Sequence, residues 1–125
     1  MELNEYQKKA MSTCMPSCEN FSYMMLNLVG EVGEFSGKVA KLIRKGTVEI
    51  DTMDDKTSDL FPMVSLPMWV HHQEELKKEA GDILWQLSGL CHVMGWTLED
   101  VAQQNLAKLA SRQQRGVIDG DGDNR

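Results

Sequence analysis

Two short pairs of carboxylates stand at helical spacing, and they are the residues of this chain best suited to chemistry. Glu31 and Glu34 lie three residues apart within the run LVGEVGE, and Glu79 and Asp82 lie three residues apart within EAGD. Residues three apart are neighbours on a helix surface, so each pair presents two carboxylates to one side. Oxygen donors of this kind select hard divalent cations such as Mg²⁺ or Mn²⁺. The spacing therefore indicates a metal site if the two pairs meet.

An ordinary solvated helix flank is the alternative explanation for each pair. Gly30, Gly33 and Gly81 leave room around the acids, and the pattern recurs in a second helical segment. Both features favour a metal site over a charged flank. A di-iron carboxylate site would need Glu-x-x-His on two helices. Position 34 is Glu and position 82 is Asp, so that motif is absent.

A third set of polar residues recurs near the end of the chain at spacings of three, four and three: Asn105, Lys108, Arg112 and Arg115. They form one polar-basic face of a helix, although cations near a helix C-terminus also occur because the dipole favours them. A polyphosphate requires acids that hold a divalent cation together with cations that neutralise the remaining phosphate charge. We therefore expect a polyphosphate substrate.

The elements that must carry these residues are predicted to be helices. Apolar residues recur at spacings of three and four through two long segments, which is typical of amphipathic helices. The first apolar seam is Leu28, Val32, Phe35, Val39 and Leu42, and the second is Leu76, Ala80, Ile83, Leu87, Leu90 and Met94. Beside the first apolar seam, one polar stripe carries Glu31, Glu34, Lys38, Lys41 and Lys45. No strand pattern stands out, so the predicted class is all-α: a small helical bundle of about four to five helices. The expected helices are residues 4–13, 21–45, 72–94 and 97–115. Gly46 is well placed to cap the end of the second helix, and Thr97 with Asp100 resembles a capping box at the start of the fourth.

One domain is expected over residues 1–115. Residues 47–70 show no sustained period and contain Pro62 and Pro67, so we expect a loop or lid inserted over the site. Residues 116–125, GVIDGDGDNR, are expected to form a Gly/Asp-rich tail with no core of its own.

Composition and charge argue against a nucleic-acid-binding, membrane or secreted protein. The chain has 125 residues, a net charge of −6 and a pI near 5.0, which argues against a nucleic-acid surface. No run of 18 apolar residues exists, and the first residues lack the apolar core of a signal peptide. We therefore expect a cytoplasmic protein. A chain of this length builds one modest core, so oligomerisation would help to stabilise it.

Together the motifs resemble the MazG-like nucleoside triphosphate pyrophosphohydrolases of the all-α NTP pyrophosphatase superfamily. The acids match its Glu-x-x-Glu … Glu-x-x-Asp signature, and the segments KKEAGDILWQLSGL, NLAKL and RQQRG strengthen the likeness. The small single-domain members, phage-borne ones included, are the most similar. The resemblance implies a homodimer or homotetramer with the active site near a subunit interface, in the host cytoplasm if the chain is phage-encoded.

The resemblance also implies an activity. The expected reaction is Mg²⁺-dependent hydrolysis of NTPs or dNTPs, with Mn²⁺ as a possible substitute, to a nucleoside monophosphate and pyrophosphate. The four metal-binding acids would be Glu31, Glu34, Glu79 and Asp82, with Glu31 also the general base. The expected substrate-binding residues are Lys38, Asn105, Lys108, Arg112 and Arg115.

Two other functions stay open at this point: a non-catalytic nucleotide-binding or regulatory bundle of the same fold, and an interaction bundle with solvated charges. The chain also departs from the family pattern. Gly30 stands where many members have a further Glu, and Gln86 stands where a Tyr is common. The 44 residues between Glu34 and Glu79 are more than is usual. These departures leave the base and the sugar of the substrate open.

Overall fold

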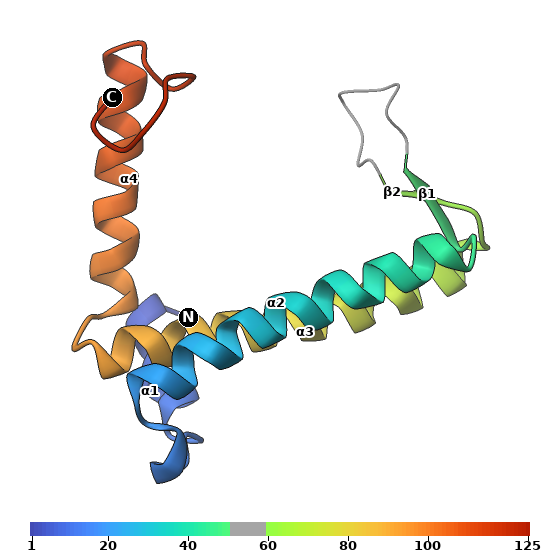
Figure 1. Cartoon of the computed structure of the whole chain (residues 1–125), viewed down its shortest axis with the longest axis horizontal. Coiled ribbons are helices and arrows are strands. Elements are labelled where there is room, and N and C mark those ends of the chain that lie inside the picture. Colours follow the sequence, from blue (N-terminus) through green and yellow to red (C-terminus); the bar gives the residue numbers. More distant parts are fainter. Residues whose placement is uncertain (51–59) are drawn as a thin grey trace. The chain divides into compact units, whose positions relative to one another are not determined.

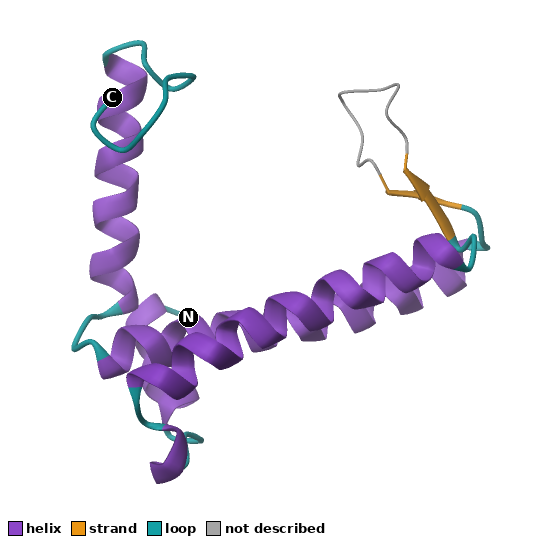
Figure 2. Cartoon of the chain, in the orientation of Figure 1, coloured by secondary structure: helices purple, strands orange, loops and turns teal. Residues whose placement is uncertain are grey.

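The structure, a computed structural model, describes residues 1–50 and 60–125 (Figure 1). These residues form four α-helices, one short 3-10 turn and two short strands, which Figure 2 distinguishes by colour. The helices are α1 (Leu3–Met11), α2 (Phe21–Arg44), α3 (Leu66–Val93) and α4 (Leu98–Gln114). The strands are β1 (Val48–Ile50) and β2 (Leu60–Pro62), and the 3-10 turn is η1 (Pro16–Cys18). In the described residues no helix is both long and apolar enough to cross a membrane.

The chain divides into two compact units. Unit 1 comprises Met1–Phe21 and Ser88–Arg125, and unit 2 comprises Ser22–Leu87. The two acid pairs lie in unit 2, and the polar-basic face of α4 lies in unit 1.

The predicted helical class is confirmed for the described residues, but a small sheet is added to it. The helices expected at 21–45 and 97–115 are found at Phe21–Arg44 and Leu98–Gln114. The strands β1 and β2 pair antiparallel, with Glu49 opposite Phe61. Each strand has only three residues, which is too short to give the alternating pattern by which strands are recognised.

The expectation of a loop over 47–70 was wrong for much of that range. The paired strands occupy part of it, and α3 begins at Leu66 instead of about residue 72. Pro67 lies in the first turn of α3, where a missing N–H breaks no helical hydrogen bond. The proline was therefore a helix-start signal that the sequence analysis took for a loop signal. The rest of the expected loop, residues 51–59, lies outside the described residues.

The core of unit 2 lies where α2, α3 and the two strands meet. In Figure 1, α2 and α3 run antiparallel and side by side, with β1 and β2 at one end of the pair. Val48 is 1% exposed, and it forms the centre of the cluster with Leu42 and Leu76. The residues packed against this cluster are Phe35, Val39, Leu60 and Trp69. This core fixes the alignment of the two helices that carry the acids.

Glycines end the helices α2 and α3 in the same way. Gly46 and Gly95 have φ of 69° and 74°, the left-handed region that favours glycine. After each glycine, the next backbone N–H donates to the carbonyl five residues earlier. Thr47 donates to Leu42 at 2.9 Å, and Trp96 donates to Cys91 at 2.8 Å. This is the Schellman arrangement, which satisfies carbonyls left free at a helix end. The predicted cap at Gly46 is confirmed.

Gln7 holds unit 1 together. Its side chain is buried, and its Nε2 donates to the carbonyls of Ser88 at 3.4 Å and Trp96 at 3.0 Å. Its Oε1 accepts from the backbone N–H of Leu98 at 2.9 Å. At the start of α4, Thr97 Oγ1 accepts from the backbone N–H of Asp100 at 3.1 Å, which is the predicted N-cap. One glutamine on α1 thus fixes the turn between α3 and α4.

Candidate active site

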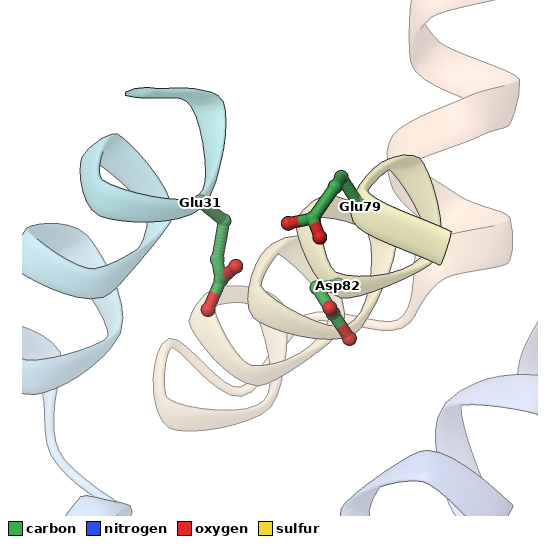
Figure 3. Close-up of side chains that lie close together, drawn as sticks. All are labelled: Glu31, Glu79 and Asp82. Atoms are coloured by element: carbon green, nitrogen blue, oxygen red, sulfur yellow. The ribbon is translucent and has the colours of Figure 1, made fainter. Parts of the chain in front are cut away.

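Three of the four predicted acids converge from two helices. Glu31 lies on α2, and Glu79 and Asp82 lie on α3, as Figure 3 shows. Each offers one carboxylate oxygen, and these oxygens all lie within 4.8 Å of one another. We call these three residues the acid cluster. Three hard oxygen donors at this separation form a set that suits a small divalent cation.

Glu79 is the buried member of the acid cluster, with 8% of its surface exposed. Its Oε1 accepts a hydrogen bond from Lys38 Nζ on α2. Its Oε2 is buried and has no hydrogen-bond partner among the residues that the structure describes. A buried carboxylate oxygen without a donor carries a desolvation penalty that a bound cation would offset. The residues present therefore fit a divalent metal ion.

Burial and the neighbouring acids alter the pKa of Glu31. Partial burial raises the pKa of its carboxyl above the ordinary value, and the charges of Glu34, Asp82 and Glu79 raise that pKa further. Asn27 Nδ2 donates to Glu31 Oε1 at 3.3 Å and opposes the shift. Like charges this close favour the protonated form unless a cation intervenes.

Glu34, the fourth predicted acid, is exposed and is not one of the three residues whose oxygens converge. Its charge nevertheless acts on the Glu31 carboxyl, so it lies within electrostatic reach of the cluster. The structure thus brings three of the four predicted acids together, and Glu34 lies outside this cluster but close enough to act on it electrostatically.

The predicted residues of α4 fall into two groups in unit 1. Asn105 and Lys108 are exposed, and with Trp96, Asp100 and Gln104 they line an open pocket of about 500 Å³. Their side chains are accessible to a ligand.

Arg112 and Arg115 are engaged by the C-terminal residues instead. Arg112 is only 5% exposed, and its Nη2 donates to the carbonyl of Asp123 at 3.2 Å and to its Oδ1 at 3.0 Å. This contact lowers the pKa of the Asp123 carboxyl, as does the nearby charge of Lys108. Arg115 Nη2 donates to the carbonyl of Arg125 at 2.6 Å. The sequence carries no signal for this role of Asp123, because repeated Gly-Asp pairs are typical of a tail without regular structure.

The comparison with known families identifies the group to which the chain belongs. Residues 19–117 match the MazG nucleotide pyrophosphohydrolase domain. The chain belongs to the MazG family. That match contains the acid cluster, Glu34 and the polar-basic face of α4, so the predicted family is confirmed.

A phage protein supports this membership. The "Gene 37 protein" of Mycobacterium phage L5 is 34% identical to this MazG-family chain over 134 residues, and the alignment covers 100% of both chains. No solved structure matches the chain.

Proposed function

We propose that this MazG-family chain hydrolyses nucleoside triphosphates, ribo or deoxyribo, to a nucleoside monophosphate and pyrophosphate with the help of Mg²⁺. The observation that carries the proposal is the acid cluster, where oxygens from two helices lie within 4.8 Å of one another and one buried carboxylate oxygen lacks a donor. We propose that the protein acts in the cytoplasm of the cell in which it is made, where its substrates are found.

The acid cluster would hold the cation through Glu31, Glu79 and Asp82, with Glu34 as a fourth acid at its edge. A bound Mg²⁺, or Mn²⁺ in its place, would neutralise charge on the phosphate oxygens and make water more acidic. Lys38 keeps the remaining charge of Glu79 compensated, and it orients that carboxylate from the opposite helix.

Glu31 is the proposed general base. Its carboxylate is part of the acid cluster, where one of its oxygens could accept a proton from a water beside the substrate. In the proposed step a water oxygen bonds to the α phosphorus, and a carboxylate oxygen of Glu31 accepts a proton of that water. The bond from the α phosphorus to the α–β bridging oxygen breaks. Its electron pair leaves with the pyrophosphate.

The exposed pair on α4, Asn105 and Lys108, is proposed to contact substrate phosphates. Both line the same pocket, and an amide together with an ammonium group suits phosphate oxygens. Arg112 and Arg115 would assist indirectly, because their bonds to Asp123 and Arg125 hold the C-terminal residues against α4.

A second copy of the chain is the proposed partner of unit 2. Within that unit the predicted apolar seams are only partly covered: Val32 is 46% and Leu87 37% exposed. On α2, Leu26 is 76% and Val29 66% exposed, and on α3 Leu84 is 40% exposed. Apolar side chains at helical spacing that remain in water indicate an interface. Light scattering coupled to chromatography should give a dimer or tetramer, and Val29→Asp should dissociate it.

The activity is tested by incubating the wild-type protein and Mg²⁺ with each common NTP and dNTP, followed by chromatography of the nucleotide products. The monophosphate should appear in equal amount with pyrophosphate. Nucleoside diphosphate as the main product would contradict the proposed site of attack. Binding of a non-hydrolysable triphosphate without turnover of any nucleotide would favour the non-catalytic alternative.

Variants of the acids test the assignment of the metal site. Glu34→Gln and Asp82→Asn should each abolish turnover, while the helical signal in circular dichroism stays close to that of the wild type. Glu74→Gln is the matched control, since Glu74 lies on α3 but pairs with Lys77 at 2.7 Å and is not in the cluster. An Asp82→Asn variant that kept full activity at low Mg²⁺ would remove the basis of the assignment.

A further inference from the structure

A second site lies beside the acid cluster in unit 2. It is a pocket of about 280 Å³ between α2 and α3, next to the start of β1. Its polar lining residues are Lys38, Lys41, Lys45, Thr47, His72 and Glu75. We call it the lysine pocket. None of the roles assigned to the acid cluster or to α4 accounts for it.

The base of the lysine pocket is part of the folded core. Leu42 and Leu76 line it, and both are 9% exposed members of the core cluster of unit 2. The pocket is therefore built on the best-packed part of this unit. Lys38 and Lys41 lie three residues apart on α2, where such residues are neighbours, and Lys45 follows directly after the helix ends at Arg44.

The charge of the lysine pocket is positive although the chain carries a net charge of −6. Lys38 is paired with Glu79, but Lys41 and Lys45 have no ion-pair partner among residues 1–50 and 60–125. The one carboxylate of the lining, Glu75, is itself paired with Lys78 at 2.7 Å. Two ammonium groups without an ion-pair partner make this concave site attractive to an anionic ligand.

The lysine pocket adjoins the acid cluster. Lys38 links the two sites, because it lines the pocket and donates to Glu79 of the acid cluster. Lys41 and Lys45 follow it at about one and two helical turns. A ligand in the pocket is thus next to the atoms that would hold the metal and the reacting phosphorus.

We propose that the lysine pocket binds the β and γ phosphates of the substrate, and hence the pyrophosphate that leaves. The proposal rests on the proposed function, since it names the part of the substrate that this pocket takes. Negative charge develops on the leaving pyrophosphate as the bond to the α phosphorus breaks. Lysines that meet that charge stabilise the transition state as well as the bound substrate.

A nucleobase is the competing occupant. Apart from the His72 ring, no aromatic side chain lines the pocket in the described residues, so stacking would be limited. Two ammonium groups without an internal partner suit a pyrophosphate better than a neutral base.

Calorimetry with magnesium pyrophosphate tests the proposal without any need for turnover. Lys41→Gln and Lys45→Gln should each weaken pyrophosphate binding by about ten-fold or more, as expected for loss of a charge-assisted hydrogen bond. Lys77→Gln is the matched control: it removes one charge from α3, at an exposed residue outside the pocket, and should change the dissociation constant by less than about two-fold. In turnover assays, inhibition by pyrophosphate should weaken in the two pocket variants, and inhibition by the monophosphate should not.

The outcomes separate this inference from the proposed function. If the wild type hydrolyses triphosphates and the pocket variants bind pyrophosphate as tightly as the control, the pocket assignment is wrong and the function stands. A changed preference among bases with unchanged pyrophosphate binding would also overturn it in favour of the nucleobase. If no triphosphate is hydrolysed but the pocket variants lose pyrophosphate binding, the pocket is an anion site and the proposed reaction is wrong.

Discussion

Lys38 on α2 donates to Oε1 of Glu79 on α3, while Oε2 of the same carboxylate is buried with no hydrogen-bond partner in the described part of the chain. One oxygen of this carboxylate is therefore paired within the protein, and the other oxygen can bind a ligand. The ion pair also joins the two helices that carry the acid cluster. Two of the predictions below concern this arrangement, and three concern unit 1.

Removal of Lys38 should make the protein more dependent on Mg²⁺. In Lys38→Met the Glu79 carboxylate loses its internal cation, so the melting temperature without metal should fall. Added Mg²⁺ should then raise the melting temperature of the variant by more than it raises that of the wild type. Thermal melts with EDTA and with saturating Mg²⁺ measure both values. Lys77→Met, which removes an exposed partner of Glu74, should show the wild-type metal response. Equal metal responses in both variants would mean that Glu79 does not bind the cation.

Glu31 should destabilise the metal-free protein at neutral pH. Because the folded state raises the pKa of Glu31, its contribution to stability is fully present below the ordinary value of 4.5 and is lost as pH rises through the raised value. Glu31→Gln should therefore raise the melting temperature in EDTA at pH 7 by up to a few degrees, about 1 kcal/mol or less after solvent screening. The gain should shrink toward zero by about pH 4. A gain that is the same at both pH values would show that repulsion within the cluster is not its cause.

Lys108→Ala should slow the reaction without loss of stability. If its ammonium group meets phosphate charge in the transition state, kcat/KM should fall by roughly one to three powers of ten. Its only ion pair in the described residues is with exposed Asp123 at 3.7 Å, so the melting temperature should hardly change. Glu99→Ala on the same helix is the control and should be nearly silent. Equal, small effects on kcat/KM would mean that this face of α4 is only a solvated surface.

Arg112→Ala should behave differently from Lys108→Ala, because Arg112 is buried and bonds Asp123 twice. Loss of these bonds should lower the free energy of unfolding by about 1–3 kcal/mol. Arg115→Ala removes the exposed arginine that directly follows α4 and should lower this free energy by less. Denaturant titrations give both values, and a stable Arg112→Ala protein would argue that the bonds to Asp123 contribute little.

Gln7→Ala should destabilise unit 1 strongly. The substitution removes three hydrogen bonds and leaves the carbonyl of Trp96 and the N–H of Leu98 without their partner. We expect a loss of about 2–4 kcal/mol in the free energy of unfolding. The neighbouring exposed Lys8→Ala should change it by no more than about 0.5 kcal/mol. A loss as small as that of the control would show that water replaces the glutamine without penalty.

The sequence by itself determined the family, the long helices and the residues that could bind metal. The reason is that these features are local: an apolar seam, a capping threonine and a Glu-x-x-Glu pair each depend on residues within one or two helical turns. The cap at Gly46 could be predicted for the same reason, since only the residue at the helix end needs a positive φ. Local signals failed at Pro67, where the same residue suits a loop or the first turn of a helix.

Tertiary structure alone decided which of these residues meet. Glu31 and Asp82 are far apart in the sequence, and their approach depends on the alignment of α2 with α3 around the core of unit 2. Burial of one oxygen of Glu79 follows from the same packing. The bond of Arg112 to Asp123 spans only 11 residues, but it depends on how the C-terminal residues fold back on α4, which helical periodicity does not predict. Helical periodicity shows on which face of a helix a residue lies. It does not show which other segment packs against that face, or how close the two segments come. Those two quantities depend on contacts between segments that are distant in the chain.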